Sequence, residues 1–105
     1  MTPGAHIAAA IEILDLILAG ENAENSLTKW GRSNRFAGSG DRHAIGDLVY
    51  DALRQKNSLT KRSKKISGRS WIIALLQKNE VNLDEYFGVS RYSPPKLKKW
   101  ELDLL

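Results

Sequence analysis

The sequence predicts an all-α fold, a compact bundle of about six or seven helices. Apolar residues recur at three- and four-residue steps in several segments, which is the spacing of one helical face. Alternation of apolar and polar residues, the pattern of a half-buried strand, never extends beyond a few positions. Capping residues precede the periodic segments, and glycine or proline follows several of them. A chain of 105 residues has room for a single hydrophobic core.

The first helix is expected to begin at Thr2 and Pro3, because Thr can cap a helix and Pro is tolerated at the first helical position. Its apolar stripe extends from Ile7 to Leu18, and Gly20 ends it. A second helix is predicted to follow the cap Asn22, to carry Leu27 and Trp30, and to end in a basic polar segment. Both helices present an apolar face that requires a neighbour.

The stretch Phe36–Arg54 predicts the central helix of the fold. Its apolar residues from Ile45 to Leu53 have the spacing of one helical face, so that face must be buried. Ser39 is the expected N-cap, because its hydroxyl oxygen can accept from a first-turn N–H group. Asp41 lies in the first turn, where the helix dipole stabilises a negative charge.

Residues 55–65 are predicted to form a loop or a short exposed helix, because Leu59 is the only strongly apolar residue among them. Ser67 is a plausible cap for a further long helix that extends to Gln77. That helix is apolar on nearly every side, which predicts a place at the centre of the core.

Two short elements are expected towards the C-terminus. Asn82 and Glu85 have the spacing of a capping box, which predicts a helix of one or two turns. Residues 93–105 are expected to form a C-terminal helix or the start of a linker. The apolar side chains on one face of this segment are candidates for a protein interface: Leu97, Trp100 and Leu104.

Residues 41–54, DRHAIGDLVYDALR, resemble the D-R-x-x-x-x-x-L-V-Y-x-x-L-R signature of the bacterial ribosomal RNA cytosine-C5 methyltransferases of the Fmu/Sun type. Residues 1–20 and 27–42 resemble the first two helices and the following loop of their N-terminal domain. That domain is similar in turn to NusB, an all-helical RNA-binding antitermination factor. The resemblance therefore implies a NusB-like RNA-binding domain over residues 1–92, followed in 93–105 by the C-terminal helix or a linker to a catalytic domain.

Two departures from that family affect the expected RNA contacts. NusB-type proteins contact RNA through a basic N-terminal helix, whereas residues 1–20 contain no Lys or Arg. The basic run KRSKK, residues 61–65, lies where the family is more apolar. RNA contact is therefore expected in the middle of the chain.

The charge distribution indicates the same region. Residues 29–69 carry eleven Lys or Arg against three Asp, a net charge of +8, and the remainder of the chain has a net charge of −4. Such a block suits nucleic acid, because neutralising phosphates releases counterions, although a solvated mixed surface is the alternative. The candidate phosphate contacts are Lys29, Arg32, Arg35, Arg42, Arg54, Lys56, Lys61, Arg62, Lys64, Lys65 and Arg69.

The sequence argues against catalysis by this chain itself. Methyl transfer to cytosine C5, which the resemblance implies for a whole enzyme, requires a cysteine thiolate and a glycine-rich loop that holds S-adenosylmethionine. The chain has no cysteine and no such loop. No metal ion or cofactor is expected, because His6 and His43 lie 37 positions apart and have no companion cluster of ligands.

Ribosomal RNA is the expected partner, and a C-terminal methyltransferase domain is a second partner that the resemblance implies. The alternative function is a protein-interaction module that docks a catalytic domain or a ribosomal or antitermination partner. The resemblance also allows a weak homodimer. No membrane contact is expected, since no run approaches about 18 apolar residues, and the absence of an export signal and of cysteine favours the cytoplasm.

Aromatic residues and glycines leave two further alternatives. Trp30, Trp71 and Trp100 lie in apolar stripes, so packing in the core is expected in preference to stacking on bases. Tyr92, next to Arg91, is expected to be exposed and is a candidate for stacking. The glycines at positions 38 and 40 favour an ordinary turn, with approach to a phosphate at the helix N-terminus as the alternative.

Overall fold

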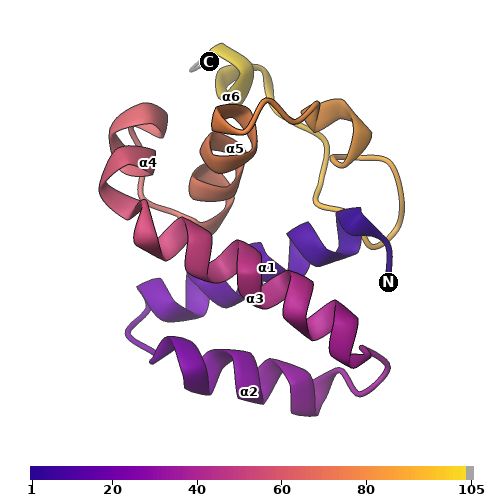
Figure 1. Ribbon diagram of the computed structural model, residues 1–105. Coiled ribbons are helices and arrows are strands. Elements are labelled where there is room, and N and C mark those ends of the chain that lie inside the picture. The colour runs from indigo at the N-terminus through magenta and orange to yellow at the C-terminus, as the bar shows by residue number, and fades with distance from the viewer. Residues whose placement is uncertain (104–105) are drawn as a thin grey trace.

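The computed structural model describes residues 1–103, and helices make up most of this part of the chain (Figure 1). No strand occurs in it, so the predicted all-α fold is confirmed. The molecule measures 37 × 29 × 20 Å along its principal axes. The elements are α1 (Pro3–Leu18), α2 (Ala23–Ser33), α3 (Ser39–Arg54), α4 (Lys56–Ser63), α5 (Gly68–Lys78), the 3-10 helix η1 (Leu83–Glu85) and α6 (Lys99–Asp103).

Helix α1 lies at the centre and contacts α2, α3 and α5. Its residues Ala10, Ile13 and Leu14 are completely buried. In Figure 1, α3 crosses α1, α2 lies on one side of this crossing, and α4 and α5 lie on the other. Helix α5 buries every residue from Trp71 to Leu76, because α1 and α4 cover different faces of it. The prediction of a core helix here is confirmed.

Helices α1 and α5 approach closely at Gly68, the first residue of α5. A Cβ atom at this position would lie 2.5 Å from the Ile11 carbonyl oxygen and 2.8 Å from Asp15 Oδ1. The Gly68 N–H donates to Asp15 Oδ1 over 2.8 Å, so a side chain of α1 satisfies one of the unpaired first-turn donors of α5. Only glycine allows this approach without displacing backbone.

Residues 56–63 form helix α4, so the helical alternative for this segment is correct and the loop is wrong. Leu59 is completely buried and anchors α4 to the core. The Trp71 indole N–H donates to Thr60 Oγ1 over 2.8 Å, which joins α4 to α5. These two contacts therefore attach α4 to the core, while its Lys and Arg side chains remain exposed on the opposite face.

Four of the predicted N-caps are confirmed and one is wrong. The side chains of Thr2, Asn22, Ser67 and Asn82 each accept a hydrogen bond from a first-turn backbone N–H. Ser39 is instead the first helical residue of α3, and Gly38 occupies the cap position. Asp41 Oδ2 accepts from the Gly38 N–H over 3.0 Å, so the first-turn carboxylate supplies the bond that ties down this helix start.

The C-terminal part has less helix than expected. The segment after Asn82 is one turn of 3-10 helix, and within the described part of 93–105 only Lys99–Asp103 is helical. Trp100 is 42% exposed, so its predicted core packing is wrong. The cause is the register of α6, which directs Glu101, 4% exposed, inward and leaves the indole at the surface.

None of the helices in residues 1–103 combines the length and the hydropathy required to cross a lipid bilayer.

Replacing Gly68 by Ala is expected to lower the free energy of unfolding by roughly 1–3 kcal/mol, because the added methyl overpacks the α1–α5 crossing. Gly46→Ala is the matched control, since a Cβ there meets nothing within 4 Å and Ala is the better helix former. Urea unfolding followed by circular dichroism measures both. Equal stability of G68A and wild type would contradict the close approach.

Candidate nucleic-acid interface

The loop of residues 34–38 reverses the chain between α2 and α3, so the end of α2 lies beside the start of α3. A hollow of about 500 Å³ opens between these two helix ends. Three exposed arginines line it, and within residues 1–103 none of them forms an ion pair with a carboxylate. We call this site the arginine hollow, and its arginines are Arg32, Arg35 and Arg42.

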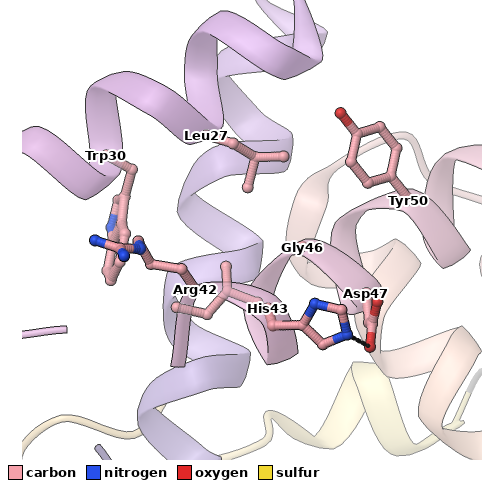
Figure 2. Close-up of a pocket in the computed structure, with 8 residues that line it drawn as sticks. Leu27, Trp30, Arg42, His43, Gly46, Asp47 and Tyr50 are labelled. Atoms are coloured by element: carbon pink, nitrogen blue, oxygen red, sulfur yellow. Dashed lines mark ion pairs between the residues drawn. The ribbon is translucent and has the colours of Figure 1, made fainter. Parts of the chain in front are cut away.

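The long side chain of Arg42 reaches from α3 across to α2 and so enters this hollow. A Cβ atom at Gly31 would lie 3.3 Å from Arg42 Cδ, so the stem of the arginine passes over the backbone of α2. Figure 2 shows the side chain extending from α3 towards Trp30 of α2. Because Gly31 has no side chain, the guanidinium of Arg42 on α3 can line the same hollow as those of Arg32 and Arg35.

A second hollow of about 370 Å³ shares Leu27 and Arg42 with the arginine hollow (Figure 2). Its polar wall is formed by His43, Asp47 and Tyr50 on α3. His43 Nε2 lies 3.5 Å from an Asp47 oxygen, and both side chains are exposed, so this pair contributes little to stability. Among residues 1–103, no three His, Asp or Glu side chains gather as metal ligands would.

Asp41 joins the start of α3 to α1. Its Oδ1 lies 2.8 Å from His6 Nε2, and its Oδ2 accepts from the Gly38 N–H. The hydrogen bond with His6, followed by that from Gly38, holds the pKa of Asp41 below its ordinary value. This carboxylate therefore fixes the helix start from which Arg42 projects.

The other predicted cations gather mainly on α4 and the turn after it. All are exposed, and we call them the α4 cluster: Lys56, Lys61, Arg62, Lys64 and Lys65. Lys64 ends α4 in the left-handed conformation, with φ of 57°. The Lys65 ammonium lies 4.6 Å from the centre of the Trp100 ring, which keeps one face of this indole covered.

Helix α3 separates the two groups of cations. Arg42 and Arg54 are twelve residues apart on this helix, which corresponds to about 18 Å of rise. The helix carries Asp47 and Asp51 between them, and Arg54 pairs with Asp51. The continuous charge block of the sequence is therefore two clusters with an acidic stretch between them.

Besides Arg54, two of the candidate phosphate contacts have acidic partners. Lys29 Nζ lies 2.9 Å from Glu21 Oε1 in an exposed pair, which is weak enough to exchange for a phosphate. Arg69 instead donates to both carboxylate oxygens of Glu101 over 2.7 and 3.0 Å, and to the carbonyls of Pro95 and Lys96. Its guanidinium holds the C-terminal segment against α5, so we remove Arg69 from the set of RNA contacts.

The Arg69 pair also governs the charge of Glu101. Burial raises the pKa of this carboxyl group, and the hydrogen bonds from Arg69 and from the Lys98 N–H more than offset that effect. The pKa of Glu101 therefore lies below its ordinary value. The buried carboxylate stays ionised and keeps α6 docked.

Sequence reasoning missed one exposed aromatic residue next to the arginine hollow. Phe36, in the loop between α2 and α3, is 74% exposed, and Tyr92 is 67% exposed, as predicted. Both line a hollow of about 530 Å³ beside α1, which we call the aromatic hollow. The available signal was an aromatic residue within the otherwise polar segment GRSNRFAGSGD.

The residues predicted to form a protein interface differ in their exposure. Leu97 is half-buried and packs against the core, whereas Trp100 remains partly exposed and has one ring face covered by Lys65. Leu104 lies outside the described residues. The structure adds Leu102 as a further exposed apolar side chain on α6.

Asp41→Asn is expected to lower stability at neutral pH and to weaken the acid dependence of unfolding. Because the folded-state pKa lies below the unfolded value of about 3.9, the ionised carboxylate stabilises the fold above that value and loses its effect as pH falls through the folded-state pKa. Thermal unfolding at pH 7 and at steps below pH 5 measures this.

The stability difference between wild type and Asp41→Asn should shrink in acid. Asp84→Asn is the control, because Asp84 is exposed and its carboxylate has no hydrogen-bond partner within residues 1–103. A difference that stays constant down to low pH would contradict the role assigned to Asp41.

Comparison of the chain with protein-family models, with curated proteins and with solved structures gives no match. The resemblance of residues 41–54 to the methyltransferase signature is therefore a hypothesis from sequence. The geometry described above is independent of it.

Proposed function

We propose that this chain is an RNA-binding module that holds structured RNA through its phosphates. The observation that carries the proposal is the arginine hollow. Three guanidinium groups, from α2, α3 and the loop between them, line one opening without carboxylate partners in residues 1–103. The guanidinium fork matches phosphate oxygens bidentately and is always charged. The three positive charges around one opening repel one another, and the negative phosphates of a bound RNA would offset that repulsion.

The α4 cluster supplies a second set of contacts at the other end of α3. The rise of α3 between Arg42 and Arg54, which precedes the α4 cluster, is about 18 Å, so the proposed ligand is a folded RNA and not a mononucleotide. Phosphate contacts fix the register and orientation of the RNA without reading its sequence. Double-stranded RNA is recognised largely by shape, which suits two rigidly spaced cationic sites.

The resemblance at residues 41–54 supports ribosomal RNA as the target. We propose that the module positions this RNA for a cytosine-C5 methyltransferase domain that follows it or associates with it. Methyl transfer itself is assigned to that domain. The proposed RNA contacts are the arginine hollow, the α4 cluster, and the weakly paired Lys29 and Arg54.

A second candidate function is docking of a protein partner at α6. Trp100 and Leu102 are exposed apolar residues on this short helix, and Leu97 is half-buried beside the core. Such docking buries apolar surface and responds little to salt, whereas phosphate binding weakens steeply as salt rises. Salt dependence therefore separates the two candidates.

Replacing the three arginines of the arginine hollow by Gln is expected to weaken binding to a small-subunit ribosomal RNA hairpin and to reduce its salt dependence. Each lost phosphate contact removes roughly 0.7–0.9 from the slope of log affinity against log salt, so the slope should fall by about 2–3. Fluorescence anisotropy titrations from low to physiological salt give both quantities.

The matched control replaces Lys78, Lys96 and Lys99 by Gln, which removes the same charge from exposed positions outside both clusters. This control should keep most of the affinity. Equal losses in the two triple variants would show that net charge alone attracts RNA. Binding that is insensitive to salt would favour the protein-docking candidate.

A further inference from the structure

We infer that the aromatic hollow receives one unstacked nucleobase of the bound RNA, an inference that rests on the proposed function. The hollow lies between Phe36, on the loop joining α2 to α3, and Tyr92, on the loop that leads to α6. These two loops and the N-terminus of α1 lie at the same end of the molecule in Figure 1. Its volume of about 530 Å³ is in the usual range of small-ligand sites.

The walls of the hollow suit a flat aromatic ligand. Small side chains of α1, Ala5, Ala8 and Ala9, leave the space open, and the two exposed rings stand at its edge. An aromatic ring held in water gains by stacking on a base, and this contact tolerates any base because each has a π-face. Two such rings around one opening therefore favour binding of a nucleobase that is not stacked within an RNA helix.

Charge around the hollow favours a nucleic acid over an apolar peptide. Arg35 lines the arginine hollow and is followed in the chain by Phe36, so the two hollows flank the same loop. On the other side, the Arg91 guanidinium lies 5.5 Å from the centre of the Tyr92 ring. A chain whose phosphates lie on these arginines can place an adjacent base between the rings.

Two polar groups in the hollow give a preference among bases. Asn34 Nδ2 donates to the Trp30 carbonyl over 2.8 Å, which leaves the amide oxygen as an acceptor. The Glu12 carboxylate also lines the hollow and only accepts. Acceptors pair with the exocyclic amino groups of adenine, cytosine and guanine, whereas uracil offers only its single ring N3–H, so uracil is expected to bind more weakly.

The test uses one RNA hairpin with three single-stranded 3′ tails: adenosine, uridine and abasic. Wild type should bind the adenosine tail at least roughly fivefold more tightly than the abasic tail, which is the lower end of the usual effect of stacking one base. The double variant Phe36→Ala, Tyr92→Ala should bind these two RNAs equally. Glu12→Gln should reduce the difference between adenosine and uridine.

Leu102→Ala is the control, because it removes an exposed apolar side chain from α6 and should keep the discrimination. Both aromatic residues are largely exposed, so the double variant should retain the wild-type circular dichroism spectrum. Equal affinity of wild type for the adenosine and abasic tails, with steep salt dependence, overturns the base site and leaves phosphate binding intact.

Failure of every hairpin to bind at low salt overturns the proposed function together with the base site. Self-association of wild type that the double variant abolishes, without discrimination among the tails, assigns the hollow to a second copy of the chain and also overturns the inference. Anisotropy and sedimentation of the same samples distinguish these results.

Discussion

The close approach of α5 to α1 at Gly68 is the constraint on which the rest of the structure depends. It allows α5 to bury six consecutive residues and lets Asp15 cap the start of the helix. The neighbouring Arg69 then holds Glu101 and the C-terminal segment, and Trp71 holds α4 through Thr60. The contacts that hold α4 and α6 are thus made by residues of α5 within three positions of this glycine.

Local signals predicted most of the fold. The caps Thr2, Asn22 and Ser67 and the apolar helix after Ser67 could be identified because capping and periodicity depend on residues a few positions apart. The inward direction of Glu101 could not be predicted from local patterns, because it depends on Arg69, which lies 32 positions earlier in the sequence. That long-range pair set the register of α6, and the expectation for Trp100 was wrong for this reason.

The charge count predicted a cationic region but not its arrangement. In the sequence, the positive charges of residues 29–69 form one continuous block. In the structure, α3 separates Arg42 from Arg54 by about 18 Å of helix rise and carries carboxylates between them. The grouping of Arg32 with Arg42 depends on how α2 meets α3, including the passage of Arg42 over Gly31. Phe36 lines the aromatic hollow together with Tyr92, which lies 56 positions later in the sequence, so local patterns could not predict this hollow.

The arginine hollow and the aromatic hollow flank the same loop of residues 34–38, which makes this end of the molecule the centre of the proposed RNA contact. Titration of the isotopically labelled chain with a ribosomal RNA hairpin, followed by backbone amide chemical shifts, tests this most directly. The largest shifts are predicted in residues 28–38, in the first turn of α3 and in α4. Shifts confined to α6, or their absence at low salt, would contradict an RNA interface at these helix ends.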